Sequence, residues 1–167
     1  MDFKEEIKVE GGWRRVVPSP APIDFKNAAL VERMARSGSI VITGGGGGIP
    51  VYVDGEGMLQ PLEGVIDKDL ASAMIGARVK ADELYILTDV PYIYKDFRKP
   101  TQEVLEFLDY ADTMKYLEAG TFGEGSMAPK IRACLSFVEK GGQKAVITEA
   151  TKLEDRRYGS KITMHYD

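Results

Sequence analysis

Five consecutive glycines, at positions 44–48, form the feature of this sequence best suited to hold a ligand. They follow the β-branched run 39–43, which predicts a short buried strand closed by glycine. Because glycine has no side chain, successive backbone N–H groups can approach an anion closely. Ligands in open α/β sheets also bind beyond the carboxyl ends of strands. We therefore predict that Gly44, Gly45, Gly46, Gly47 and Gly48 hold phosphate, and the alternative is a flexible turn.

Two common phosphate-binding motifs do not fit this run. A dinucleotide-binding fingerprint that begins at Gly44 requires glycine at position 49, where the sequence has Ile49. A phosphate loop of the Lys-Ser/Thr type requires Gly-Lys after the glycines, but Ile49 and Pro50 follow them. The run therefore predicts a phosphate site of another kind.

Two lysines stand in the first turns of predicted helices, where a positive charge opposes the helix dipole. Lys68 lies between Asp67, which suits the N-cap, and Asp69, which suits the first turn. Lys130 has the same place in a helix that follows the glycine-containing loop 123–126. An exposed cation there costs about 0.3–1 kcal/mol unless an anion lies nearby. Convergence of both lysines on one polyphosphate is thus one interpretation, and a solvated lysine beside carboxylates is the other.

Three further polar or reactive groups are less informative. Thr88 and Asp89 follow a predicted strand and could bind a ribose or a base, or only cap a turn. Cys134 falls on the apolar stripe of a predicted helix, which favours core packing. His165, the only histidine, is the third residue from the end of the sequence, and we expect no catalysis by it.

The elements that would position these groups follow from hydrophobic spacing and turn residues. Residues 1–22 are expected to be extended or irregular, 51–57 to form a hairpin-like excursion, and 91–109 to be rich in loops. Short apolar strands alternating with helices predict a mostly parallel sheet covered on both faces. We expect helices over 24–37, 67–79, 110–118 and 129–140, and strands over 39–43, 84–88, 145–148 and 161–165.

Composition narrows the class of protein. The 167 residues are 44% hydrophobic and 29% charged, as in one globular domain, and a single cysteine excludes an internal disulfide. The 22 Lys and Arg against 26 Asp and Glu form no long block of one sign, so no nucleic-acid partner is expected. No apolar run is long enough for a membrane span and the first residues are no signal peptide, so we expect a cytoplasmic protein without membrane contact.

Together, the motifs resemble those of the carbamate kinases, a branch of the amino acid kinase family. The pair GGGGIP and IDKDLA, with RRVVPSP upstream, favours carbamate kinases over acetylglutamate, glutamate or uridylate kinases. The matching segments are GGWRRVVPSP, ITGGGGGIPV, GVIDKDLAS, LYILTDVPYIY and FGEGSMAPKI, which span residues 11–131 in the order of the family.

The resemblance implies a three-layer α/β/α fold and reversible phosphoryl transfer between ATP and carbamate, which mostly forms ATP from carbamoyl phosphate and ADP. Mg²⁺ would accompany the nucleotide, and no residue is expected to ligate a metal directly. By motif, Lys68 and Lys130 would hold the transferring phosphoryl group and the nucleotide phosphates, and Asp69 would orient both lysines. The nucleotide- or phosphate-binding residues implied are the glycines at 44–48, Thr88, Asp89, Ser126 and Met127.

The sequence departs from the family pattern in two places. Ala128 stands where the family usually has glycine. The family also opens with a strand and a Gly-Gly-Asn-Ala phosphate loop, whereas the only asparagine here, Asn27, lies in a predicted helix. We expect residues 1–22 to be an arm left from the lid subdomain and residues 23–167 to be the nucleotide-binding domain.

These departures lead to three hypotheses. In the first, an N-terminal portion absent from these residues, supplied by another chain or a longer precursor, is required for catalysis. In the second, the protein is an inactive nucleotide-binding module, and in the third it is a structural scaffold. A half-sheet would leave an unpaired edge or uncovered face, so we expect a homo-oligomer or association with a complementary N-terminal portion.

Overall fold

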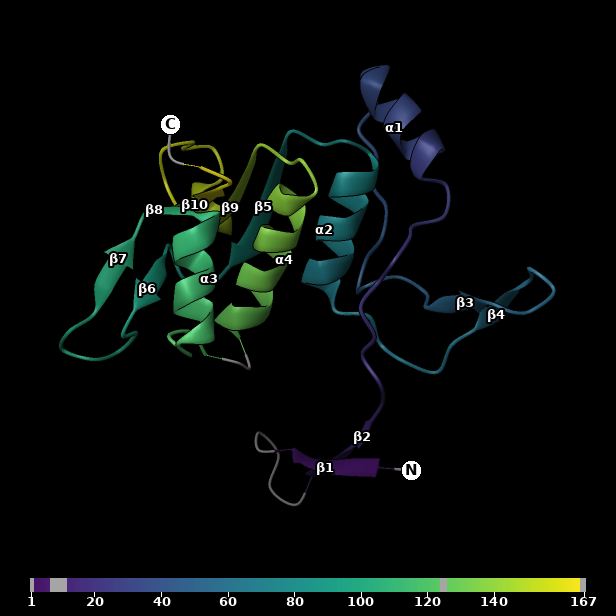
Figure 1. Cartoon of the computed structure of the whole chain (residues 1–167), viewed down its shortest axis with the longest axis horizontal. Coiled ribbons are helices and arrows are strands. Elements are labelled where there is room, and N and C mark those ends of the chain that lie inside the picture. The colour runs from purple at the N-terminus through teal and green to yellow at the C-terminus, as the bar shows by residue number, and fades with distance from the viewer. Residues whose placement is uncertain (1, 7–11, 124–125, 166–167) are drawn as a thin grey trace.

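The computed structural model of the chain describes residues 2–6, 12–123 and 126–165, so part of the predicted loop 123–126 lies outside the described residues. Its centre is a four-stranded sheet in the order β5-β9-β10-β8 (Figure 1). β5 runs parallel to β9, and β10 runs parallel to β8 but antiparallel to β9. The strands are β5 (Glu83–Thr88), β8 (Phe107–Asp109), β9 (Lys144–Glu149) and β10 (Ser160–Thr163).

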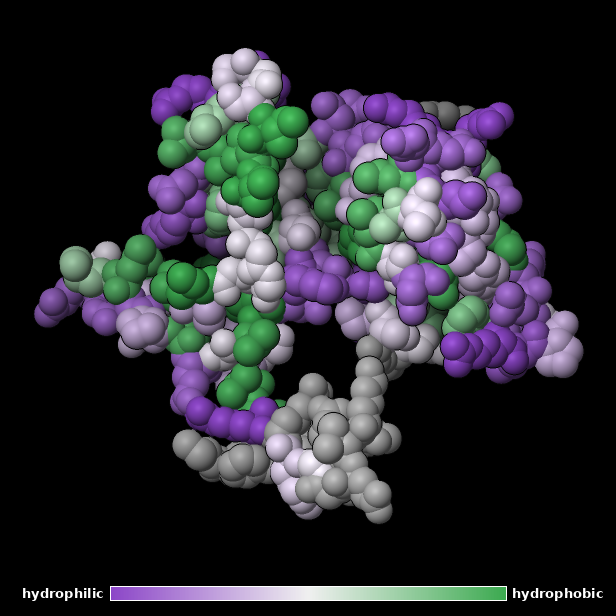
Figure 2. Space-filling model, turned by 180° about the vertical axis from the view of Figure 1, so that it is seen from behind, coloured by the Kyte–Doolittle hydropathy of each residue, from purple (hydrophilic) through white to green (hydrophobic). Residues whose placement is uncertain are grey.

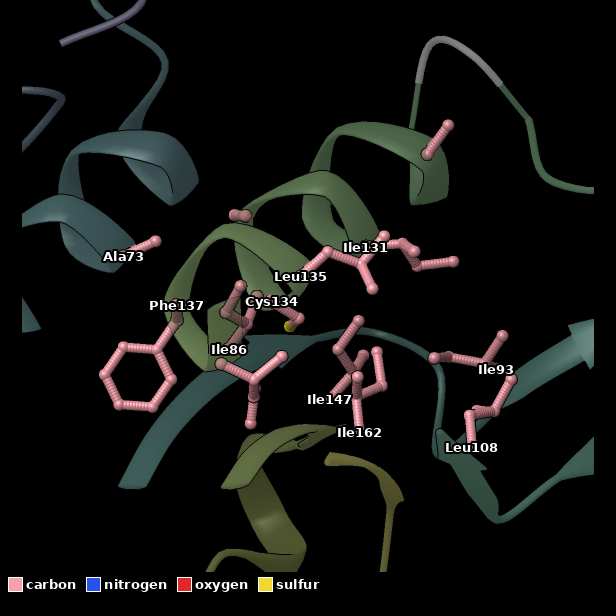
Figure 3. Packing of buried hydrophobic residues seen from close by; sticks show 14 of the residues in the cluster. Ala73, Ile86, Ile93, Leu108, Ile131, Cys134, Leu135, Phe137, Ile147 and Ile162 are labelled. Atoms are coloured by element: carbon pink, nitrogen blue, oxygen red, sulfur yellow. The ribbon is translucent and has the colours of Figure 1, made fainter. Parts of the chain in front are cut away.

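Three helices pack along one face of this sheet: α2 (Lys68–Arg78), α3 (Tyr110–Glu118) and α4 (Met127–Glu139). The apolar stripe of α4 forms the centre of the core, where Cys134 and Leu135 meet the strand residues Ile86, Ile147 and Ile162 (Figure 3). Burial raises the pKa of the Cys134 thiol, so this side chain packs as an apolar group. The prediction of core packing for Cys134 is confirmed.

The start of α2 follows the predicted capping chemistry, whereas α4 begins at Met127 instead of the expected 129 and has no side-chain cap. The Asp67 carboxylate accepts hydrogen bonds from the backbone N–H groups of Asp69 and Leu70, which fixes the first turn of α2. α1 (Ala28–Arg36) was expected from Asp24 but begins at Ala28. The Asp24 carboxylate instead accepts hydrogen bonds from Arg78 of α2 and from the Phe25 N–H, and Asn27 adopts a left-handed conformation with φ of 67°.

Residues 39–43 form no strand with any part of the chain that the structure describes, so the predicted buried strand is wrong for this structure. The side chains of Ile40 and Ile42 are 97% and 98% exposed. A β-branched run favours an extended backbone, but a strand also needs a neighbour to pair with. Here the segment descends from α1 past α2 without such a neighbour (Figure 1).

The loop-rich segment 91–109 contains three short strands that the sequence did not predict. β6 (Ile93–Lys95) and β7 (Glu103–Leu105) pair as an antiparallel hairpin, followed by β8. The Ser160 hydroxyl accepts a hydrogen bond from the Ile93 N–H at 2.7 Å and donates one to the Leu105 carbonyl oxygen. This hydroxyl therefore attaches the hairpin to the central sheet.

Two further hairpins lie outside the central sheet. β1 (Asp2–Glu6) pairs with β2 (Gly12–Val16) in the N-terminal arm, and β3 (Val51–Val53) pairs with β4 (Leu59–Pro61), which confirms the hairpin-like excursion. A 3₁₀ turn, η1 (Ala150–Lys152), follows β9. Within the described residues, no helix is long and apolar enough to cross a membrane.

Candidate phosphate-binding site

A cleft of about 310 Å³ lies where the glycine loop (residues 44–48), the first turns of α2 and the strand β5 meet. Residues 43–47 and residues 85–87 of β5 both line it. Lys68, Asp69, Ser72 and Ile75 of α2 line it as well. The cleft therefore joins the two strongest sequence signals, the glycine run and the Lys68–Asp69 pair.

The glycine loop requires glycine for its backbone conformation. All five residues have positive φ angles, between 59° and 99°, which side chains other than glycine rarely adopt. Gly47 is further constrained, because a Cβ atom there would lie 1.9 Å from the Ile66 carbonyl oxygen. The Gly48 N–H donates to the Gly45 carbonyl oxygen at 2.8 Å and closes the turn.

The structure brings Lys68, Asp69 and Lys130 together, although Lys130 is 61 residues away from Asp69 in the sequence. The Lys68 Nζ donates to Asp69 Oδ1 at 2.9 Å, and the Lys130 Nζ donates to Asp69 Oδ2 at 2.8 Å. The contact arises because α2 and α4 pack side by side with their first turns at the same end of the molecule, the lower end in Figure 1.

The side chains of the two lysines differ in their exposure to solvent. The side chain of Lys130 is 15% exposed and that of Lys68 is 61% exposed, while Asp69 is buried. Burial alone would raise the pKa of the Asp69 carboxyl, but hydrogen bonds from Lys130 and Lys68 outweigh burial and lower this pKa. The hydrogen bond to Asp69 also raises the pKa of Lys68. The three groups thus carry one net positive charge beside the cleft, which suits an anion.

Lys130 does not line the cleft itself and is joined to it through Asp69. Five further predicted residues do not line the cleft either: Gly48, Thr88, Asp89, Ser126 and Met127. The Thr88 hydroxyl donates to the adjacent Asp89 carboxylate at 3.1 Å. Ser126 is exposed, and Met127 is half-buried against the hydrophobic core. Nucleoside contacts by Thr88, Asp89 and Met127, phosphate binding by Gly48 and nucleotide or phosphate binding by Ser126 stay predictions.

Sequence reasoning missed other residues that line the cleft, among them Ser72, Ile75, Tyr85 and Leu87. A signal existed for the first two, because positions 72 and 75 follow Lys68 by four and seven residues and share its helix face. Tyr85 and Leu87 flank the buried Ile86, so alternation along the strand places them on the other face.

The described residues offer no ready-made metal site. They contain no group of three or more His, Cys, Asp or Glu side chains placed to hold an ion. Both Asp69 oxygens already accept hydrogen bonds from lysines. Mg²⁺ often binds through the phosphates of a nucleotide with few protein ligands, and the described residues are compatible with such delivery.

The comparisons with known proteins agree with this fold. The model of the amino acid kinase family matches residues 4–149, so the chain belongs to the amino acid kinase family. Within it, the chain is 46% identical to the carbamate kinase of Thermoplasma volcanium over 141 residues, 84% of this chain and 46% of the relative. It is 44% identical to that of Halobacterium salinarum over 90% of this chain and 50% of the relative.

Solved structures give the same result. Carbamate kinase from Giardia lamblia bound to AMP-PNP superimposes with a TM-score of 0.87 at 31% identity, covering 97% of this chain and 51% of that one. The expected amino acid kinase-like α/β fold and the resemblance to carbamate kinases are therefore confirmed. The chain spans about half the length of the curated relatives that it matches.

Proposed function

We propose that this chain is the nucleotide-binding part of a carbamate kinase-type phosphotransferase, which moves a phosphoryl group between ATP and carbamate. The observation that carries the proposal is the buried Asp69 carboxylate, which holds Lys68 and Lys130 beside a cleft walled by the glycine loop. Its relatives are carbamate kinases, and one of them is bound to AMP-PNP, a nucleotide analogue.

This arrangement suits phosphoryl transfer, which depends on positioning and charge neutralisation more than on a protein nucleophile. Lys130 is fixed by burial and by Asp69, so it supplies a charge at a constant place. Lys68 is the more exposed lysine and can turn toward a phosphate. The family resemblance makes ATP formation from carbamoyl phosphate and ADP the favoured direction, with Mg²⁺ bound to the nucleotide.

The relatives are about twice as long as the part that this chain matches, so we expect the remaining wall of the site to come from a complementary portion. The second candidate is a module that binds ATP or ADP without catalysis. The observation that favours this candidate is that the cleft lined by Lys68, Asp69 and the glycine loop lies beside β5, which pairs with β9 on one side and has no partner on its other side among the described strands.

Replacing Lys130 tests the catalytic role. With the complementary portion supplied, Lys130→Ala should lower the rate of ATP formation from carbamoyl phosphate, ADP and Mg²⁺ by about a hundredfold or more, because a fixed charge on the phosphoryl group is lost. Lys115→Ala is the matched control, since Lys115 is an exposed lysine that also pairs with a carboxylate, that of Asp112. An unchanged rate in Lys130→Ala would show that its assigned role is wrong.

Calorimetry with ADP and Mg²⁺ separates the two candidates. Both predict that the chain binds ADP. Binding without turnover, even after the complementary portion is added, favours the non-catalytic module, and no binding at all contradicts both.

A further inference from the structure

The α-helices of the described residues all end in the same backbone turn. Two positions after the last helical residue φ is positive, and the next N–H donates to the carbonyl oxygen five residues before it. α1, α3 and α4 have a glycine at the position of positive φ, namely Gly38, Gly120 and Gly141. α2 has Lys80 there, with φ of 53°. Because a side chain is strained in this conformation, glycine is the favoured residue, and the lysine must be explained by what its side chain contacts.

The Lys80 side chain reaches the segment that contains α1. Its Nζ lies 3.5 Å from Glu32 Oε1. Beside it, Arg78 in the last turn of α2 donates to Asp24 Oδ1 from Nε at 2.8 Å and from Nη2 at 2.6 Å. Two cations at the C-terminal end of α2 therefore hold two carboxylates of residues 24–36.

Apolar burial contributes little to the attachment of α1. The helix contains no buried residue, and its nine residues are fewer than the roughly 12–15 that an isolated helix needs in water. The side chains of Arg78 and Asp24 are about half exposed, and that of Lys80 is mostly exposed. Exposed ion pairs are weak and weaken further as salt is added. The view from behind shows a groove between the end of the molecule that carries α1 and the larger mass of the chain (Figure 2).

Residues 37–43 connect α1 to the glycine loop, which is attached to α2 in a different way. A Cβ atom at Gly44 would lie 3.2 Å from Ile75 Cδ1, and one at Gly47 would overlap the Ile66 carbonyl oxygen. These are close packing contacts, which salt does not screen. The chain is thus held by charge near the C-terminal end of α2 and by packing near its N-terminal end, with residues 37–43 running between the two (Figure 1).

We propose that α1 is a hinged helix whose attachment to α2 is controlled by ionic strength. At low salt, Arg78 and Lys80 hold Asp24 and Glu32. As salt rises, α1 leaves α2 and loses its helical structure, residues 37–43 act as the hinge, and the glycine loop stays in place. This inference does not rest on the proposed function, because it involves no phosphate ligand.

Hydrogen exchange of the whole chain without ligand tests the hinge. When NaCl is raised from about 20 mM to about 500 mM, the amides of α1 should exchange roughly fivefold faster relative to those of α4, because the ion pairs are screened. The Gly48 amide, which closes the turn of the glycine loop, is the internal control. Its exchange relative to α4 should change by less than about twofold.

Lys80→Gly should have two effects that a merely structural lysine would not combine. The midpoint of urea unfolding should not fall, because glycine removes the backbone strain, while α1 should exchange roughly threefold faster at low salt. Adding Asp24→Asn removes the second ion pair but keeps an acceptor for the Phe25 N–H. In this double variant α1 should exchange fast at low salt, and NaCl should have little further effect.

Asp112→Asn is the matched control, since the Asp112 carboxylate pairs with Lys115 and is 46% exposed, against 48% for Asp24. It should leave the exchange of α1 unchanged.

Three results would overturn the inference. Exchange of α1 that responds neither to salt nor to the variants shows that packing holds the helix. Equal acceleration at Gly48 shows that the glycine loop moves with α1, so residues 37–43 are no hinge. Salt dependence that persists in full in the double variant shows that other charges are responsible.

Discussion

A single buried carboxylate, that of Asp69, organises the candidate site at the level of residues. It accepts one hydrogen bond on each oxygen, from Lys68 and from Lys130. Removing one partner of such a buried ion pair leaves an uncompensated charge. The placement of both lysines therefore depends on Asp69.

Asp69→Asn should reduce the free energy of unfolding by about 3 kcal/mol near neutral pH, because the amide leaves both ammonium groups without their carboxylate. The pKa of Asp69 is lowered in the folded chain, so its contribution is complete above the ordinary value of 3.8 and is lost as the pH falls through the lower folded value. Urea unfolding of both proteins between pH 7 and pH 2.5 should show a difference that shrinks below about pH 4. A difference that stays constant over this range contradicts the assignment.

Two glycines of the same loop form a matched pair for substitution. Gly45→Ala should lower stability by about 1–2 kcal/mol, since Gly45 has a positive φ but open space around its Cβ position. Gly47→Ala should cost clearly more, because its Cβ atom would overlap the Ile66 carbonyl oxygen. Chemical denaturation measures both, and equal losses would show that the contact with Ile66 is unimportant.

At the scale of elements, the sequence predicted helices better than strands. α3 begins and ends where hydrophobic spacing and Gly120 place it, and the Asp67 cap of α2 is visible in the sequence. β6, β7 and β8 were missed, because strands of three residues are too short for a periodic signal and their pairing is set by distant contacts such as that of Ser160. Residues 39–43 show the opposite error, a strand pattern without a partner.

The site was predictable to a similar extent. Lys68, Asp69 and the glycine loop are close in sequence, and their chemistry is visible in their spacing. The direct contact between Lys130 and Asp69 depends on the packing of α4 against α2, which local patterns do not encode. Tyr85 and Leu87 were missed because the cleft exists only where the edge of the sheet stays open.

Ser160→Ala should lower stability by about 1–3 kcal/mol, because it leaves the buried Ile93 N–H without an acceptor. The loss should be local, with faster hydrogen exchange in β6 and β7 than in the wild-type protein. Ser72→Ala is the control, since the Ser72 hydroxyl binds the Lys68 carbonyl oxygen on an exposed helix face and its loss should have little effect. Unchanged exchange in the hairpin of Ser160→Ala would contradict its role as an anchor.

On the scale of the whole molecule, burial is uneven along the chain. The hydrophobic core lies within residues 73–162, whereas α1 contains no buried residue and the hairpin of β3 and β4 exposes most of its side chains. Stability should follow this division, because segments with few buried apolar contacts open with little free energy.

Limited proteolysis of the chain alone should therefore cleave first within residues 23–65 and leave the segment that contains the central sheet intact for much longer. Mass spectrometry of the early fragments identifies the sites. Equal cleavage rates across the chain, or first cleavage within α4, would show that the core is not the more stable unit. Binding of the complementary portion should slow the first cleavages within residues 23–65.

The bridge between Lys130 and Asp69 ties the first turns of two helices, so the same ammonium group serves both the scaffold and a ligand. An anion that draws Lys130 toward itself weakens a contact that holds α2 against α4. Ligand binding and helix packing therefore compete for the Lys130 ammonium group. A bound phosphate should raise the free energy of unfolding by less than its own contacts with the protein would provide. Such competition would favour release of a bound anion, because a tightly held anion strains the helix pair that holds it.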